Sequence, residues 1–173
     1  ELFSYFRELA AERRRQPGDD VASILVSPND DGEQLSDEEL DAYFLLLVIA
    51  GNETTRFLLA GGLEQLLLQP DAMQQLREDP SLIPAAVEEM IRWVTPVIHM
   101  RRTVTEDTQA FGLDVAAGSK FVLYFSAANR DPQVFEDPHS FRVDRTPNKH
   151  VGFGAGHHFC MGAYLARLEA QIF

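Results

Sequence analysis

The stretch from Phe153 to Gly162 reads Phe-Gly-Ala-Gly-His-His-Phe-Cys-Met-Gly and contains Cys160, the only cysteine of the chain. A thiolate can bind a soft metal ion or act as a nucleophile. A helix is predicted to begin at Ala163, so its N-terminus would stabilise a thiolate at position 160. Glycine lets a backbone approach a planar or bulky group closely, and glycines stand before the cysteine at Gly152, Gly154 and Gly156. These residues favour a ligand or reactive role for Cys160, with a packed structural thiol as the alternative.

A zinc site is a second hypothesis for the same stretch, with ligands drawn from His150, His157, His158 and Cys160. Adjacent histidines rarely reach one metal ion, and no Cys-x-x-Cys pair supports the site. A cysteine nucleophile with a histidine base would need an orienting third group, which the sequence does not identify. Nucleophile-elbow, phosphate-loop and dinucleotide fingerprints are also absent.

A carboxylate and a hydroxyl lie side by side at Glu53 and Thr54, inside an apolar segment where each is costly to bury. One hypothesis is a proton relay, with Gly51 opening the helix groove for a small ligand. The other is a helix bend, in which Thr54 bonds back to a carbonyl and Glu53 faces solvent. The residues alone leave both hypotheses open.

Two further charged groups stand out. Glu89 and Arg92 lie three residues apart on one helical face, close enough for an ion pair, and Arg145 is a candidate third member. Such a buried cluster would stabilise the fold rather than perform chemistry.

Arg101 and Arg102 end a predicted strand. Exposure at the surface is the usual state of such arginines, but a cofactor that bears carboxylates would favour a bidentate arginine partner.

The elements that must position these groups are mainly helical, which predicts a mainly α fold with small β-sheets (α+β). Ser36 and Glu39 form a capping box that predicts a helix start. That helix is apolar almost all round from Ala42 to Ala50, so we expect its middle to be buried. Helices are predicted over 2–15, 36–68, 84–94 and 163–173, short strands over 97–104, 109–115 and 120–125, and an ordered meander over 127–149.

Composition narrows the class of protein. The net charge of -12 over 173 residues argues against nucleic acid as a partner. One cysteine excludes a disulfide scaffold and fits a reducing cytoplasm. The longest apolar run, Tyr43 to Ala50, is too short to span a bilayer, so no membrane is expected. The chain starts at Glu1 without methionine and stops at Phe173 inside a predicted helix, so we expect a piece of a longer protein.

Taken together, these segments resemble the cytochrome P-450 family, the haem-thiolate monooxygenases. The cysteine stretch fits the family's Phe-Gly-x-Gly-x-His-x-Cys-x-Gly at every fixed position. Four motifs occur in family order: Ala50-Gly51-Asn52-Glu53-Thr54-Thr55, Glu89-Met90-Ile91-Arg92, the meander from Phe141 to Arg145, and Phe153 to Gly162.

The resemblance implies a role for each residue of the cysteine stretch. Cys160 would be the axial thiolate on the iron of haem b (iron protoporphyrin IX), with Phe153 packed beside the sulfur. His158 and Arg102 match the family's partners of the haem propionates. The backbone would lie against the porphyrin at the glycines, Gly152, Gly154, Gly156 and Gly162.

The resemblance also implies roles on the long helix. Ala50 and Gly51 would border the oxygen pocket, and Glu53 and Thr54 would form the acid–alcohol pair that delivers protons to dioxygen. The structural charge triad of the family is matched by Glu89, Arg92 and Arg145.

By this resemblance, residues 1–173 are the C-terminal portion of a single cytochrome P-450 domain, without its N-terminal part and extreme C-terminus. The whole protein would be a soluble, cytoplasmic bacterial enzyme that inserts one atom of dioxygen into an apolar small molecule, such as a terpenoid, steroid or lipid. A ferredoxin or similar carrier would supply electrons, docking near Cys160 where Arg142, Arg145 and Lys149 cluster in sequence. Two alternatives, a zinc-binding structural module and a noncatalytic helical fragment, do not explain the motif order.

Overall fold

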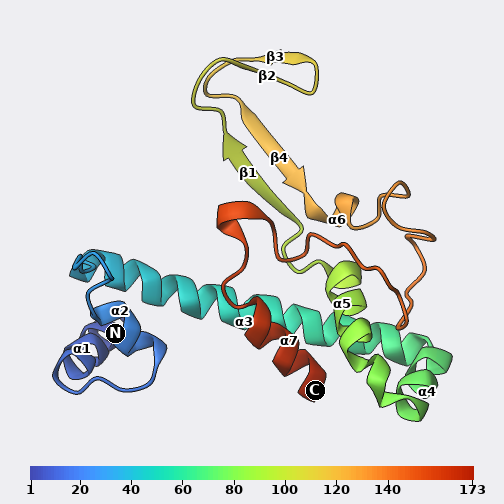
Figure 1. Ribbon diagram of the computed structural model, residues 1–173, viewed down its shortest axis with the longest axis horizontal. Helices are drawn as coiled ribbons and strands as arrows, with labels where there is room; N and C mark the ends of the chain where they lie inside the picture. Colours follow the sequence, from blue (N-terminus) through green and yellow to red (C-terminus); the bar gives the residue numbers. More distant parts are fainter. The chain divides into compact units, whose positions relative to one another are not determined.

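The computed structural model describes residues 1–173, which divide into two compact units, 1–52 and 53–173. Seven α-helices, two short 3-10 helices and two small antiparallel sheets make up the chain (Figure 1). The predicted mainly α fold with small sheets is therefore confirmed. The boundary between the units falls inside the longest helix, α3 (Asp37–Leu68).

The first unit contains α1 (Leu2–Arg15), α2 (Val21–Val26) and the start of α3. Its core is built around Phe6 and Phe44, whose ring centroids lie 5.2 Å apart. The predicted capping box is present, because the Ser36 N–H donates to Glu39 Oε2 at 2.8 Å and the Glu39 N–H donates to Ser36 Oγ at 3.2 Å. The six-residue helix α2 was not predicted, since it is too short to show a helical period.

The predicted burial of the middle of α3 is wrong for this chain. Leu46, Val48 and Ile49 are all exposed, and the buried residues near the start of the helix are Leu40 and Phe44. A helix that is apolar all round needs neighbours on every side, and the core of the first unit covers only the side of α3 that carries Leu40 and Phe44. By length and composition α3 could also cross a membrane, but the core helix of a soluble protein passes the same test.

The second unit packs helices around one apolar core. Its helices after α3 are α4 (Pro70–Glu78), η1 (Pro80–Leu82), α5 (Ile83–Val94), α6 (Phe125–Ala128), η2 (Gly156–His158) and α7 (Ala163–Ile172). A β-carbon on Gly62 would lie 2.0 Å from the Met90 methyl, so the glycine leaves room for the Met90 side chain between α3 and α5. The core residues are Leu58, Ala72, Ala86, Val87, Met90, Ile91, Phe141, Val143 and Ala170.

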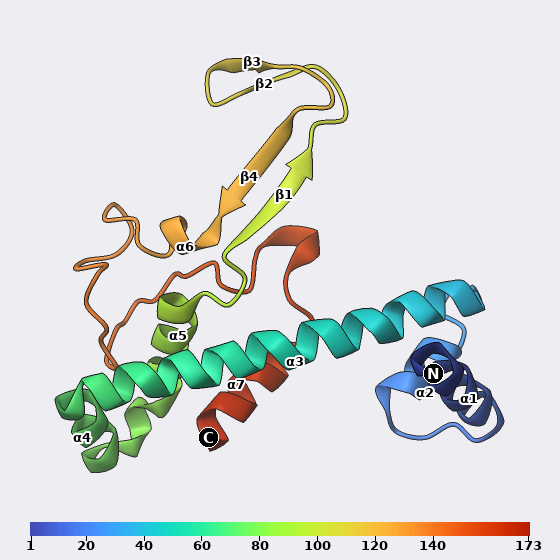
Figure 2. The same ribbon diagram turned by 180° about the vertical axis from the view of Figure 1, so that it is seen from behind.

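Two short sheets follow α5 in the sequence (Figure 2). Strand β1 (His99–Thr103) pairs antiparallel with β4 (Lys120–Tyr124), and β2 (Thr108–Ala110) pairs with β3 (Leu113–Val115). The single strand predicted over 109–115 is thus a hairpin. Its turn residues Phe111 and Gly112 have φ values of 55° and 76°, as a two-residue primed turn requires. Phenylalanine is an unusual residue at such a position, which hid the turn in the sequence.

Candidate functional site

The cysteine loop ends in an exposed thiol held by backbone hydrogen bonds. The Cys160 N–H donates to the Phe153 carbonyl at 3.0 Å, and the Gly154 N–H donates to the Val151 carbonyl at 2.9 Å. Gly154 and Gly156 adopt φ values of 73° and 64°, in the left-handed region where glycine is favoured. The loop therefore turns sharply and presents Cys160 at the surface of the second unit, without packing it in the core. The alternative of a packed structural thiol is excluded for this chain.

The glycines of the loop do not all serve the purpose expected of them. A β-carbon on Gly152 would lie 2.6 Å from Ile91 Cγ2, so this glycine permits close packing against α5, not against a cofactor. By contrast, a β-carbon on Gly156 would meet nothing within 4 Å, and one on Gly162 would meet only Cys160 Sγ, at 3.9 Å. The positions of Gly156 and Gly162 are therefore open, and the one at Gly162 faces the thiol.

The donor set at the thiol fits haem better than zinc. A porphyrin supplies the equatorial ligands of its iron and needs an axial ligand from the protein, for which a cysteine thiolate suffices. The chain contains no group of three or more His, Cys, Asp or Glu side chains placed to hold a metal ion, so the zinc hypothesis finds no ligand set. Exposed apolar side chains flank Cys160, as a porphyrin face requires: Phe159, Met161, Tyr164 and Leu165.

The two residues matched to the haem propionates are both exposed. His158 ends the 3-10 helix η2, and Arg102 lies in β1, where its Nη1 donates to the Arg101 carbonyl at 3.0 Å. Successive residues of a strand point to opposite faces, so Arg101 and Arg102 cannot both face one ligand from the same side. Contact with propionates stays a prediction for His158 and Arg102.

The acid–alcohol pair of α3 is placed differently from expectation. Glu53 is exposed and pairs with Arg56 one helical turn later, instead of lying in a buried helix centre. A β-carbon on Gly51 would meet nothing within 4 Å, and Ala50 is exposed as well. Ala50 and Gly51 belong to the first unit, and Glu53 and Thr54 belong to the second. The roles of these residues at dioxygen stay predictions.

The predicted charge cluster is confirmed and fully buried. Arg92 Nε donates to Glu89 Oε2 and Arg92 Nη2 to Glu89 Oε1, both at 2.7 Å, while Arg145 Nε donates to Glu89 Oε2 at 2.9 Å. The side chains of Glu89 and Arg92 have 0% exposure and that of Arg145 has 5%. Both arginines also donate to the Ser140 carbonyl, so the cluster ties α5 to the meander.

The basic patch proposed for docking a carrier is smaller than the sequence indicated. Arg145 is buried in the Glu89 cluster and cannot contribute to a surface. Arg142 is exposed, but it donates to Asp144, and this hydrogen bond together with the charge of Asp144 raises the pKa of Arg142. Lys149 is also exposed. The patch therefore reduces to Arg142, already paired, and Lys149.

Sequence reasoning missed a second charged cluster, formed by Glu88, His150 and Arg167. His150 Nε2 lies 2.9 Å from Glu88 Oε2, and Arg167 Nε donates to Glu88 Oε1 at 2.6 Å. Burial would raise the pKa of Glu88, but the hydrogen bonds from His150 and Arg167 and the charge of Arg167 outweigh it and lower the pKa to about 2. The adjacent Glu88-Glu89 pair on one short helix was the only signal of this cluster in the sequence.

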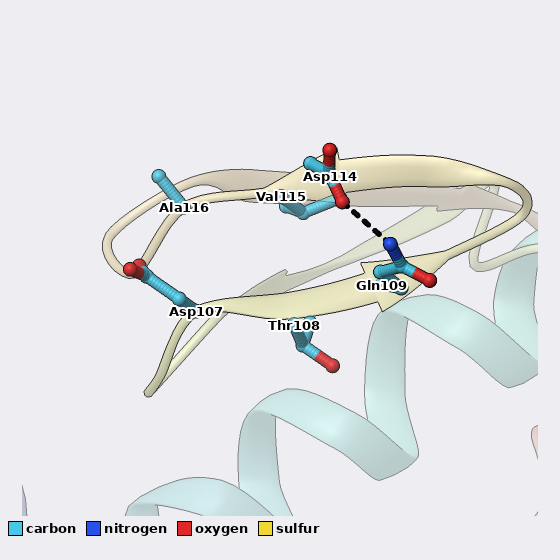
Figure 3. Close-up of a pocket in the computed structure, with 6 residues that line it drawn as sticks. All are labelled: Asp107, Thr108, Gln109, Asp114, Val115 and Ala116. Atoms are coloured by element: carbon cyan, nitrogen blue, oxygen red, sulfur yellow. Dashed lines mark hydrogen bonds between the residues drawn. The ribbon is translucent and has the colours of Figure 1, made fainter.

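One hollow of the surface lies away from all these residues. It has a volume of about 580 Å³ and is lined by the β2–β3 hairpin and its flanks (Figure 3). Its two carboxylates are already engaged, because Asp114 accepts from Gln109 Nε2 at 2.7 Å and Asp107 accepts from the Ala117 N–H at 2.8 Å. The hollow contains none of the predicted site residues and offers no group for chemistry.

Comparison with known proteins identifies the family. A family model for cytochrome P-450 matches residues 2–173, so the chain belongs to the cytochrome P-450 family. It is 50% identical over 168 residues to a steroid C26-monooxygenase of Mycobacterium tuberculosis, covering 97% of this chain and 45% of that protein. It is 45% identical over 174 residues to a methyl-branched lipid omega-hydroxylase of Mycobacterium bovis, covering 99% of this chain and 41% of that protein.

Solved structures agree with this family membership. The substrate-free crystal structure of CYP109E1 from Bacillus megaterium superposes with a TM-score of 0.94 at 42% identity, covering 99% of this chain and 44% of that one. The corticosterone complex of the same protein gives a TM-score of 0.93 at 42% identity, with coverage of 99% and 46%. The chain thus spans less than half the length of the relatives that it matches.

Proposed function

We propose that residues 1–173 are the C-terminal portion of a single cytochrome P-450 domain, and that the whole protein is a haem-thiolate monooxygenase. The observation that carries the proposal is the cysteine loop. The loop has an exposed thiol, a backbone closed by the Cys160 N–H to Phe153 carbonyl bond, and open space at Gly156, so Cys160 would be free to hold a cofactor metal through its sulfur. Segments outside this chain would cover the exposed apolar residues of α3.

Cys160 would hold haem b through its thiolate, and the exposed apolar residues beside it would pack on the porphyrin face. Haem with a thiolate ligand supplies the cleavage of the O–O bond of dioxygen. His158 and Arg102 would orient the cofactor by binding its carboxylates, since charge-assisted hydrogen bonds to a carboxylate are short and strong. Phe153 would pack beside the sulfur, and the backbone at Gly154, Gly156 and Gly162 would lie near the ring.

Glu53 and Thr54 would hold and pass on the protons that the reaction consumes. In the structure Glu53 is paired with Arg56, so it must exchange this partner to act as a relay. Its exposure to solvent is suitable for a group that collects protons, and Thr54 is the adjacent hydroxyl. Ala50 and Gly51 have small side chains and would leave room for dioxygen beside the helix.

We infer that the substrate is an apolar small molecule such as a steroid, a branched lipid or a terpenoid. The relatives whose names specify a substrate act on a steroid and on methyl-branched lipids, which supports this class without choosing among its members. The electron donor would be a ferredoxin or a similar carrier, and the enzyme would work in the bacterial cytoplasm.

The test is isotope incorporation by the full-length gene product. The haem-loaded protein is incubated with a bacterial ferredoxin, its reductase and ¹⁸O-labelled dioxygen, against a panel of steroids and methyl-branched fatty acids. The proposal predicts a hydroxylated product that carries one labelled oxygen atom, and no product with Cys160→Ala. A labelled product that still forms in Cys160→Ala would contradict the assignment of the ligand.

A further inference from the structure

The cluster of Glu88, His150 and Arg167, here called the Glu88 cluster, takes no part in the mechanism proposed above. It joins three separate segments: Glu88 lies on α5, His150 begins the cysteine loop, and Arg167 lies on α7. The side chain of His150 is only 4% exposed, and those of Glu88 and Arg167 are 27% and 32% exposed. A polar side chain that is removed from water needs hydrogen-bond partners, and Glu88 supplies one to His150 and to Arg167.

His150 connects Glu88 to the backbone of the loop. The Gly152 N–H donates to His150 Nδ1 at 3.1 Å, so Nδ1 must carry a lone pair and not a proton. The other ring nitrogen, Nε2, then carries the proton and donates it to Glu88 Oε2 at 2.9 Å. Glu88 thereby fixes the tautomer of His150, and the tautomer holds the Gly152 amide in place.

Arg167 connects the same carboxylate to Phe153. Its Nε and Nη2 donate to Glu88 Oε1 at 2.6 Å and Oε2 at 3.0 Å, a two-point contact that orients the guanidinium plane. The guanidinium carbon lies 4.6 Å from the centroid of the Phe153 ring, within the range of a cation–π contact. The backbone of Phe153 in turn accepts the N–H of Cys160 at 3.0 Å.

We propose that Glu88 is a positioning residue for Cys160, acting through His150 on the Gly152 amide and through Arg167 on the Phe153 ring. The proposal rests on the proposed function in that Cys160 is taken as the haem ligand. Both branches end on residues immediately before Gly154, where the loop makes its first left-handed turn. The cluster therefore sets the position from which the loop delivers the thiol.

The neighbouring carboxylate shows that this role is separate from holding the fold together. Glu89 points into the buried arginines and binds the meander, whereas Glu88 contacts only the loop and α7 among the hydrogen bonds of its side chain. Adjacent residues on a helix point about 100° apart, so two successive carboxylates can serve two different segments.

The test compares Glu88→Gln with the wild-type full-length gene product, both loaded with haem. Glutamine keeps the shape but loses the charge that holds Arg167 and its second acceptor oxygen. Hydrogen exchange of the Cys160 amide is expected to be at least about tenfold faster, because charge-assisted hydrogen bonds that order the loop are lost. The reduced carbon monoxide complex is expected to lose part of its thiolate-specific long-wavelength band, while far-UV circular dichroism stays unchanged.

A second variant and a matched control keep the result decisive if Glu88→Gln folds poorly. Arg167→Lys keeps the positive charge beside Glu88 but removes the flat guanidinium from Phe153, so it should also accelerate exchange at Cys160. Glu106→Gln makes the same chemical change at an exposed position and should alter neither readout.

Two results would overturn the proposal. One is an unchanged Cys160 exchange rate in both Glu88→Gln and Arg167→Lys. The other is exchange that accelerates equally in α5, α7 and the loop, since this would show general destabilisation and not a specific effect on the thiol. If the wild-type protein takes up no haem, the proposed function fails, but the exchange comparison still decides whether the cluster positions the loop.

Discussion

Replacing Glu89 by glutamine is the sharpest perturbation of the charge cluster that joins α5 to the meander. Arg92 Nη2 and the Arg142 N–H donate to Glu89 Oε1, while Arg92 Nε, Arg145 Nε and Asn148 Nδ2 donate to Oε2. Both oxygens accept from an arginine, so the amide group of glutamine faces a positively charged donor whichever way it turns.

The magnitude follows from these contacts and from their burial. At least two charge-assisted hydrogen bonds are lost, each worth about 1.5–3 kcal/mol. Removing one partner of a buried ion pair costs about 3–5 kcal/mol, because the remaining charge stays buried without compensation. With the Glu89 and Arg92 side chains at 0% exposure, solvent cannot screen the loss. We therefore expect Glu89→Gln to lower the free energy of unfolding by about 3–5 kcal/mol.

The assay is urea unfolding of the haem-free full-length gene product, followed by far-UV circular dichroism. Glu106→Gln is the control, since its exposed side chain should change the free energy of unfolding by less than about 0.5 kcal/mol. A loss in the free energy of unfolding below about 1 kcal/mol for Glu89→Gln would refute the reasoning, because removing one partner of a buried ion pair should cost more than this.

Three further predictions concern the loop, its support and the proposed relay. Gly152→Ala should lower the melting temperature, because its β-carbon would lie 2.6 Å from Ile91 Cγ2; an unchanged melting curve would contradict the close packing. The pKa of Glu88 is lowered from 4.5 to about 2, so its contribution to stability is present above pH 4.5 and is lost as the pH falls towards 2. The stability gap between wild type and Glu88→Gln, measured by unfolding at several pH values, should close over that interval, and a gap independent of pH would count against the ion pairs. Thr54→Ala should divert electrons from product to peroxide, measured as peroxide formed per electron consumed, and unchanged coupling would argue against a relay.

The local signals of the sequence predicted several of the elements that hold the candidate residues. The capping box at Ser36 and Glu39 gave the start of α3, and the three-residue spacing of Glu89 and Arg92 gave their ion pair. A helix was predicted to begin at Ala163, and α7 begins there. These features depend on residues within a few positions of one another, where spacing and propensity are sufficient.

Contacts between distant residues were not predictable in the same way. The hydrogen bonds that Glu88 accepts from His150 and Arg167 join residues 62 and 79 positions apart, and no local pattern links them. Burial of the middle of α3 was predicted wrongly. The apolar side chains show that the helix favours contact with other segments, but they do not show which segment of the chain makes that contact. The β2–β3 hairpin was missed because Phe111 occupies a left-handed position that sequence rules assign to glycine or asparagine.

The central claim is that Cys160 is the thiolate ligand of a haem iron. The most direct measurement is the difference spectrum of the full-length gene product, loaded with haem, reduced and exposed to carbon monoxide, for wild type and Cys160→Ser. We expect a Soret band at the long wavelength characteristic of thiolate ligation in the wild type, and its loss in Cys160→Ser. Absence of that band in a haem-loaded wild type, or its persistence in Cys160→Ser, would contradict the account.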